Sequence, residues 1–357
     1  MRVLQAAERD RERFDHAVAA SPLADVLQSW EWGEVKRATG WVPQRLIVED
    51  EDGTIRAACS VLRLEPVRGV PPLLYAPRGP VLDYGDDRAL RALLAFIAAH
   101  GEGAFMFKCD PPVVAGGEAA RALARAGLRG VHAGAFGGTQ PTTVMLLDLS
   151  VGADKVFEGF KPKWRYNVRV AERRGVRVRD AGRSDLDAFH VLYRETAARD
   201  GFVPRGRSYF ETLFDRLEPH GMLRMFLAEL EGEPVAAIIL MSMGERAIYV
   251  YGASSGRRRD AMPNHILQWT AIKWAAEAGY SLYDFRGVSP VRDGEPVIPH
   301  LAGLNRFKEG FGARTVEYAG EFDLVLRPLW YQAWLRGAPA AMRALTKLRG
   351  RSADAGD

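Results

Sequence analysis

Cysteine is scarce in this sequence of 357 residues, and so are patterns that bind metals. The two cysteines, Cys59 and Cys109, exclude a disulfide framework, a CxxC redox pair and a cysteine-based zinc site. The seven histidines show no close ligand spacing, so we expect no metal site. Apolar runs of roughly 18 residues, which a membrane-spanning helix needs, are also missing. The first residues lack the apolar core of a signal peptide, and we therefore expect a cytoplasmic protein.

Several short catalytic motifs are missing as well. No GxGxxG follows the first predicted strand, and GxxxxGK[ST], HExxH and GxSxG do not occur. These absences argue against a metal site and against a serine-hydrolase site. The net charge is only +4, from 49 basic and 45 acidic side chains, so charged partners must be inferred from local patches.

The length is roughly twice that of a typical domain, and the predicted elements occur in one order twice. That order is a hairpin, a helix and a short strand, expected at 46–61, 89–99 and 105–107 and again at 225–241, 265–278 and 280–285. The helix of the second set is expected to have Asn264 as its N-cap. Two copies of one α/β unit would leave this pattern, although two unrelated α/β domains could also show it by chance.

A basic helix is predicted between the two sets. Pro162 suits its first turn and Gly175 its end. Residues 154–183 contain ten basic and four acidic side chains, and three arginines share the outer face: Arg165, Arg169 and Arg173. Such a row is either a solvated face or a contact for a nucleic-acid backbone. A second basic stretch is predicted as a C-terminal helix with a frayed tail, at Arg336, Arg343, Lys347, Arg349 and Arg351.

Lysine is rare beside arginine, with eight lysines against forty-one arginines, so lysine positions merit separate examination. Three of them lie in segments rich in aromatic residues or glycine: Lys36, Lys108 and Lys308. Residues 303–312 are predicted as a glycine-rich loop that either places the Lys308 ammonium against an acceptor or is an ordinary turn. Asp110 and Asp284 end predicted strands, where active-site groups of open α/β sheets gather, but both also suit caps or turns.

Ten short motifs together carry a resemblance that covers nearly the whole chain. They are QSWEWGEVK (28–36), YAPRGP (75–80), KCDP (108–111), KWRYN (163–167), AERRGV (171–176), RDGF (199–202), YGASS (251–255), PN (263–264), YDFRG (283–287) and FKEGFG (307–312). In this order and spacing they resemble the Fem (FemABX) family of peptidoglycan-bridge aminoacyltransferases. The chain looks like the short form, because no heptad stretch for the coiled-coil insertion of some members is present.

The resemblance implies an α/β (α+β) fold of two tandem GNAT-like acyltransferase domains, with mixed sheets flanked by helices. It places domain 1 at 1–146 plus 319–357 and domain 2 at 147–318. The family reaction moves an amino acid from aminoacyl-tRNA to the side-chain amine of the diamino acid in a peptidoglycan stem peptide. No cofactor is implied, and we expect a monomer. A UDP-linked and a lipid-linked acceptor both stay open, the latter with peripheral membrane association.

Ester aminolysis needs positioning, oxyanion stabilisation and removal of a proton from the attacking amine. The resemblance implies that Lys308, paired with Phe307, stabilises the oxyanion or the tRNA terminus. Asp110 matches an acid considered as a general base, although the substrate can also take up the proton. The phosphates and sugar of the acceptor are assigned to Lys36, Arg205, Tyr209 and either Tyr249 or Tyr251. The spacing of four would put Arg205 and Tyr209 on one helix face. For the tRNA we select, mainly from charge, Lys161, Lys163, Arg165, Arg169 and Arg173.

Other functions remain as alternatives. An acyl-CoA-dependent GNAT N-acyltransferase shares the domain fold, but residues 257–262 keep the leading arginines of the [QR]xxGx[GA] pyrophosphate loop and lack both of its glycines. An aminoacyl-tRNA–protein transferase would use the same donor with a protein N-terminus as acceptor. A non-catalytic tRNA-binding or precursor-binding protein is a third class, and loss of turnover in Lys308→Ala would distinguish a catalyst from it.

Overall fold

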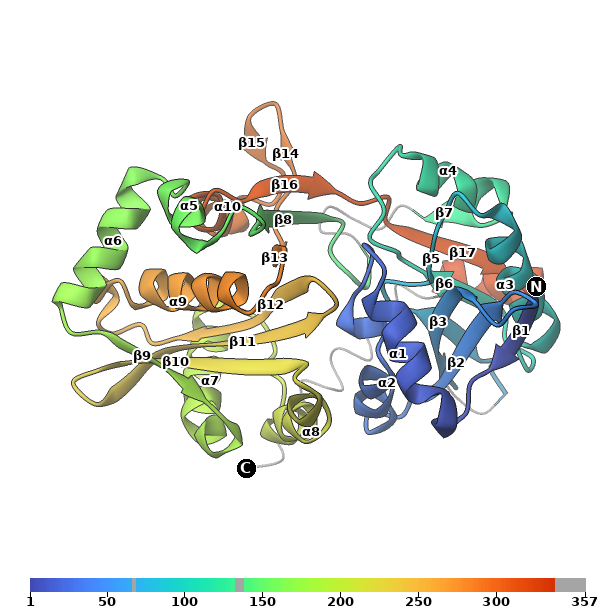
Figure 1. Ribbon diagram of the computed structural model, residues 1–357, viewed down its shortest axis with the longest axis horizontal. Coiled ribbons are helices and arrows are strands. Elements are labelled where there is room, and N and C mark those ends of the chain that lie inside the picture. Colours follow the sequence, from blue (N-terminus) through green and yellow to red (C-terminus); the bar gives the residue numbers. More distant parts are fainter. Residues whose placement is uncertain (66–68, 132–137, 338–357) are drawn as a thin grey trace.

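Two mixed β-sheets lie side by side in the computed structural model, which describes residues 1–65, 69–131 and 138–337 (Figure 1). The first sheet has the order β1 (Arg2–Gln5), β2 (Val42–Glu49), β3 (Ile55–Leu64), β4 (Leu73–Ala76), β6 (Met106–Cys109), β17 (Glu321–Val325) and β7 (Arg129–Val131), and β5 (Val81–Leu82) pairs with β3. The helices that accompany this sheet are α1 (Arg11–Ala19), α2 (Trp30–Arg37), α3 (Asp87–His100) and α4 (Glu118–Arg125).

The second sheet has the order β16 (Arg314–Glu317), β8 (Thr143–Asp148), β13 (Leu282–Gly287), β12 (Arg246–Ser254), β11 (Glu233–Met243), β10 (Leu223–Leu230) and β9 (Arg177–Ala181). Six helices accompany it within the described ranges: α5 (Ala153–Glu158), α6 (Pro162–Arg173), α7 (Leu186–Asp200), α8 (Arg207–Leu217), α9 (Pro263–Glu277) and α10 (Ala302–Glu309). A small separate hairpin joins β14 (Val291–Arg292) and β15 (Glu295–Pro296).

The predicted repeat of hairpin, helix and strand is confirmed. Each sheet holds an antiparallel hairpin, β2–β3 or β10–β11, followed by a parallel pair whose strands are joined across a helix. The parallel pairs are β4–β6, with α3 between them, and β12–β13, with α9 between them. The prediction of Asn264 as N-cap is wrong, because Met262 turns the chain with a φ of 56° and α9 already begins at Pro263.

The chain crosses between the sheets near both ends of the second unit. Strand β8 is flanked by β13 and β16, whereas β17 returns to the first sheet between β6 and β7. The division at residues 146 and 319 stays a proposal, and β8, which straddles the first of these points, lies in the second sheet. The tail residues Arg343, Lys347, Arg349 and Arg351 lie outside the described part of the chain. Across the described residues, no helix is long and apolar enough to cross a bilayer.

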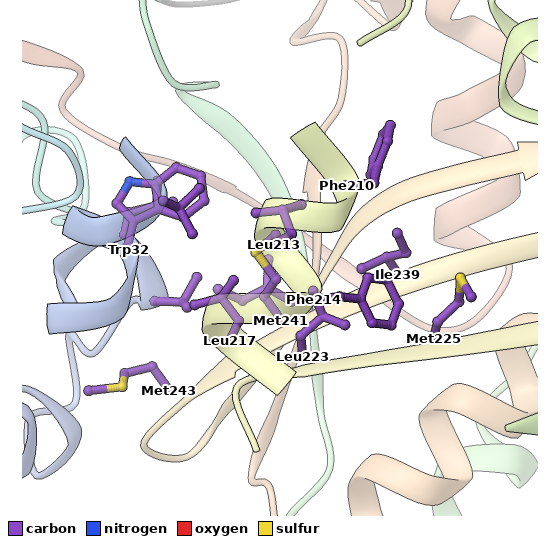
Figure 2. Close-up of a cluster of buried hydrophobic side chains, with 14 of the residues drawn as sticks. Trp32, Phe210, Leu213, Phe214, Leu217, Leu223, Met225, Ile239, Met241 and Met243 are labelled. Atoms are coloured by element: carbon purple, nitrogen blue, oxygen red, sulfur yellow. The ribbon is translucent and has the colours of Figure 1, made fainter. Parts of the chain in front are cut away.

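One hydrophobic core joins the two halves. Alternate residues of β10 and β11 face opposite sides of the second sheet, and the side covered by α7 and α8 merges with the side of the first sheet covered by α1 and α2. Figure 2 shows Trp32 of α2 beside Leu213 and Leu217 of α8, with Met243 close by. Gly244, with a φ of 56°, lies so close to the Ala19 carbonyl that a Cβ atom would not fit.

Candidate active site

The centre of the candidate site is Lys308, which lies where the parallel strands β12 and β13 separate. Their pairing joins Arg246–Ile248 to Leu282–Asp284. Beyond this point the Nζ atom of Lys308 donates hydrogen bonds to the carbonyl oxygens of Phe285 (2.6 Å) and Gly287 (2.7 Å). The side chain is buried and its Nζ lies 5.9 Å from the centre of the Tyr249 ring. Lys308 therefore satisfies β13 carbonyls in the gap that opens between two strands.

The environment of Lys308 keeps both of its protonation states accessible near neutral pH. Burial lowers the pKa of Lys308 to about 7, a shift that Asp284 opposes and Arg286 reinforces. The ammonium form has three N–H groups, of which two are used by the carbonyls, so one proton remains for a substrate oxygen. The neutral form has a lone pair that can accept a proton instead.

The segment that carries Lys308 differs from the prediction. Residues 303–312 were expected to form a glycine-rich loop, but they form most of α10 and the turn after it. The helix places Asn305 and Lys308, three residues apart, on its buried face, where Asn305 exchanges two hydrogen bonds with the backbone of Ser289. Gly310 and Gly312 lie in the turn that ends the helix, and Gly312 has a φ of 80°.

The C-terminal end of α10 is held by the beginning of α6. The indole Nε1–H of Trp164 donates to the carbonyl oxygen of Phe307 (2.9 Å), and the backbone N–H of Lys161 donates to the carbonyl oxygen of Gly310 (2.9 Å). A Cβ atom on Gly310 would overlap the Trp164 ring. The Phe307 ring packs edge-on against His265, with 5.3 Å between ring centres. These contacts fix the position from which Lys308 reaches β13.

Asp110 follows β6 and is buried in the first half of the chain. Its carboxylate accepts hydrogen bonds from the Tyr75 hydroxyl (2.7 Å) and the backbone N–H of Arg78 (2.6 Å). Burial raises the pKa of Asp110 to about 6, although the Arg78 charge and both hydrogen bonds lower it. Arg78 has a φ of 55°, an unusual backbone conformation for a residue with a Cβ atom. Both carboxylate oxygens of Asp110 thus have donors within the protein.

A second buried carboxylate lies beside Lys308. Asp284, predicted to end a strand, lies within β13. Its carboxylate accepts the backbone N–H of Arg286 (2.6 Å) and lies 3.6 Å from the guanidinium of Arg246, which is equally buried. Arg286 has a φ of 59°, so each buried aspartate is capped by an arginine in the left-handed region. The negative charge of Asp284 raises the pKa of Lys308 and so favours its ammonium form.

Residues 140 and 141 connect the two aspartate clusters. The Arg286 guanidinium donates to the side-chain oxygen of Gln140 (2.6 Å), and the Arg78 guanidinium donates to the carbonyl oxygen of Pro141 (2.8 Å). Sequence reasoning missed Gln140 and gave no role to either arginine. The arginines lie within the motifs at 75–80 and 283–287, so motif membership was the available signal for them.

The predicted acceptor residue Lys36 lies at the end of α2, between two tryptophan rings. Its Nζ atom is 5.9 Å from the ring centre of Trp32 and 5.7 Å from that of Trp41. Trp41 in turn lies 6.4 Å from the Tyr75 ring, whose hydroxyl binds Asp110. A continuous series of contacts therefore leads from Lys36 to the Asp110 cluster.

Arg205 and Tyr209 are brought together, but not by the predicted geometry. Helix α8 begins at Arg207, so the expectation that both lie on one helix face is wrong. The Arg205 guanidinium instead lies 4.5 Å from the Tyr209 ring centre, reaching it from the irregular segment that precedes the helix. The Tyr209 hydroxyl is 2.9 Å from the Tyr251 hydroxyl.

Tyr249 and Tyr251 belong to different clusters because β12 is irregular between them. The register with β11 shifts there, since Ile239 faces Tyr251 while Leu240 faces Tyr249, which leaves Val250 as an extra residue. Tyr249 accordingly packs with the core around Lys308, and Tyr251 packs with the core around α8. Burial raises the pKa of Tyr249 to about 12.

The basic helix is confirmed as α6, with Pro162 in its first turn and Gly175 after its end. Its five selected side chains differ in their partners. Lys161 pairs with Glu309 at 3.2 Å, both exposed, and Arg165 donates to the carbonyl oxygens of Glu158 and Phe160. Arg173 lies 5.7 Å from the exposed Tyr166 ring, and Lys163 and Arg169 are also exposed.

No group of three or more His, Cys, Asp or Glu side chains in the part of the chain that the structure describes could hold a metal ion. The region 257–262, compared above with a pyrophosphate loop, forms a short turn of 3-10 helix ahead of α9. The buried polar groups around Lys308 and Asp110 thus remain the arrangement best suited to chemistry.

Comparisons with known proteins agree with this architecture. The sequence model of the FemAB family matches residues 10–233, and that of a GNAT acetyltransferase domain matches residues 160–309. A Staphylococcus haemolyticus protein named Lipid II:glycine glycyltransferase is 30% identical over 94% of this chain and 96% of its own length. A Staphylococcus aureus protein of the same name is also 30% identical over the same shares. The alignments are longer than this chain, so both relatives hold segments that it lacks.

Solved structures show the same fold. The crystal structure of FemX has a TM-score of 0.83 at 28% identity, covering 93% of this chain and 99% of that one. The structure of L-PGS from Bacillus licheniformis has a TM-score of 0.55 at 14% identity, with 97% of each chain covered, and shares the fold alone. The prediction of tandem GNAT-like units is thereby confirmed. The family match, the 30% identical relatives and the shared fold therefore show that the chain is an acyltransferase that belongs to the FemAB family.

Proposed function

We propose that this acyltransferase moves an amino acid from aminoacyl-tRNA to the side-chain amine of the diamino acid in a peptidoglycan precursor stem peptide. The observation that carries the proposal is the Lys308 amine, held by two carbonyls at the gap between β12 and β13 with one N–H group left over. The names of the staphylococcal relatives support a lipid-linked peptidoglycan precursor as the substrate class. A charged tRNA donor implies that the reaction takes place in the cytoplasm, and we expect the enzyme to act as a monomer.

The reaction is the aminolysis of an ester. The acceptor amine attacks the carbonyl carbon of the aminoacyl ester, a C–N bond forms, and the C–O bond to the tRNA ribose breaks. The amine proton leaves for the ribose oxygen, directly or through a carboxylate such as Asp110. The Lys308 ammonium donates its remaining N–H to the carbonyl oxygen as that atom gains negative charge. The half-buried Phe307 ring limits the access of water beside it.

The acceptor is assigned to the surface that runs from α2 to α8. Lys36 and Arg205 supply positive charge for its phosphates, and the paired hydroxyls of Tyr209 and Tyr251 supply donors for phosphate or sugar. Tyr249, on the other side of β12, is assigned to the reacting end near Lys308. UDP-linked and lipid-linked precursors both carry a diphosphate, so this surface accommodates either.

The tRNA is assigned to the outer face of α6. Lys163, Arg169 and Arg173 are exposed there, and Lys161 and Arg165 flank them while bound to neighbouring groups. Phosphates are held by such a face without reading sequence. Trp164, on the inward side of the same helix, contacts Phe307 and Gly310, so the helix assigned to tRNA also supports the element that carries Lys308.

The test is incubation of the protein with a mixture of charged tRNAs and either UDP-linked pentapeptide or the lipid-linked precursor. We expect a product whose mass exceeds that of one acceptor by an amino-acid residue. A parallel reaction with acetyl-coenzyme A and no tRNA serves as the control. An acetylated product there, with charged tRNA left unused, would refute the proposal.

A further inference from the structure

The chain after β17 forms a helix over 328–337 that attaches to the first sheet by one face only. Tyr331 on that face is almost fully buried, and its hydroxyl donates to the Asp323 carboxylate (3.0 Å). Trp334 packs against Phe105, with 5.7 Å between ring centres. These two aromatic residues are three positions apart, so they fix which face of the helix points outward.

The outward face and its flanks are apolar where solvent would favour polar side chains. Leu329 is 86% exposed, Trp330 41% and Leu335 40%, which gives three exposed large hydrophobic residues within seven positions. Arg327 and Arg336, both exposed, stand at the two ends of this group. Exposed large apolar side chains gathered on one short helix with basic residues beside them mark an interaction surface.

The charge and side-chain types identify the partner. Tryptophan, leucine and arginine on one short helix are the combination found in helices that lie in the headgroup region of a bilayer. The sequence beyond residue 337 continues with four basic side chains, Arg343, Lys347, Arg349 and Arg351, against two acidic ones, Asp354 and Asp357. An anionic surface complements this excess of positive charge.

We propose that helix 328–337 binds the surface of an anionic lipid bilayer. Leu329 and the exposed edges of Trp330 and Leu335 enter the boundary between headgroups and acyl chains, and Arg327 and Arg336 lie over the headgroup phosphates. Binding of this kind does not depend on acyl transfer. Its use, which is to bring the acceptor surface to a lipid-linked precursor, rests on the proposed function.

The test is co-sedimentation with vesicles of phosphatidylcholine alone or mixed with phosphatidylglycerol. Wild-type protein should bind the mixed vesicles, and added salt should weaken that binding. Leu329→Glu should reduce it by about tenfold or more, because one fully exposed apolar side chain is lost and a like charge is added. Arg336→Glu should weaken binding to the mixed vesicles and leave the uncharged ones unaffected.

The matched control is Val191→Glu, since Val191 is 67% exposed on α7, away from the helix. This variant should bind vesicles as the wild type does, and thermal melting of all variants checks their folding. The proposal is overturned if wild-type protein ignores mixed vesicles or if Leu329→Glu binds them equally well. It is also overturned if light scattering shows a dimer that only Leu329→Glu dissociates, because the surface would then belong to a second copy of the chain.

Discussion

The protonation of Lys308 provides a quantitative test of the proposed chemistry. Replacing Lys308 with alanine removes the N–H group assigned to the developing oxyanion, and loss of one such donor costs on the order of 10²–10³ in rate. The pKa of about 7 makes this cost depend on pH. Below pH 7 the ammonium dominates, and above it the neutral amine does. The protonated fraction falls from about nine-tenths at pH 6 to about one-tenth at pH 8.

The assay is single-turnover transfer from charged tRNA, measured for the wild type and for Lys308→Ala at each pH. The acceptor amine also titrates, but it does so in both proteins, so the ratio of the two rates isolates Lys308. We expect this ratio to decline about ninefold between pH 6 and pH 8. Lys308→Arg keeps its charge over this range, and whatever activity it retains should lack the decline.

Two outcomes would refute the reasoning. A ratio that rises with pH would mean that the neutral amine accepts a proton, and a constant ratio would mean that Lys308 only supports the backbone. The second outcome is physically reasonable, because alanine leaves the carbonyls of Phe285 and Gly287 without their donor. Each buried carbonyl left without a hydrogen-bond donor costs about 1–3 kcal/mol of stability, so thermal melting of the variant must accompany the kinetics.

Three further predictions concern other parts of the molecule. Trp164→Phe removes the hydrogen bond to Phe307 and keeps most of the ring. The lost hydrogen bond is worth about 1 kcal/mol in positioning Lys308, so kcat should fall about fivefold with little change in KM. An unchanged kcat would contradict this. Arg169→Ala and Arg173→Ala should each reduce the slope of log Kd for tRNA against log salt concentration by about 1. Transfer activity that does not change with salt between about 50 and 300 mM would argue against tRNA binding to this face of α6. Cys59 and Cys109 should resist Ellman's reagent until the protein unfolds, because both are buried and burial raises the pKa of both thiols; rapid labelling of native protein would show otherwise.

Local sequence patterns predicted the repeated unit well, because its hairpins and crossover helices are defined by short-range signals. The turn glycines Gly53 and Gly232 and the apolar spacing of α3 and α9 identify these elements directly. The place of β17 in the first sheet came instead from the family resemblance. Helix α10 was missed because its flanking glycines were read as a loop, although Asn305 and Lys308 have helical spacing on its buried face.

The site was harder to predict because its contacts join distant residues. Lys308 binds carbonyls 21 and 23 positions away, and Gln140 meets Arg286 at a separation of 146. Backbone carbonyls are present at every residue, so composition cannot single out the ones that a lysine will use. The Arg205–Tyr209 pairing was expected for the wrong geometric reason, since Arg205 lies in the irregular segment before α8 and not in the helix itself.

The continuous core between α2 and α8 restricts how this enzyme can be recombined with its relatives. One packed core contains Trp32 from the first half and Leu213 and Leu217 from the second. At its edge the backbone of Gly244 lies directly against the Ala19 carbonyl. A chimera that takes its second unit from a homologue would have to import the matching surface of α1 and α2 as well. Swapping units at the sequence midpoint should therefore yield aggregated protein, whereas exchanging exposed loops that do not contact this core should leave folding intact.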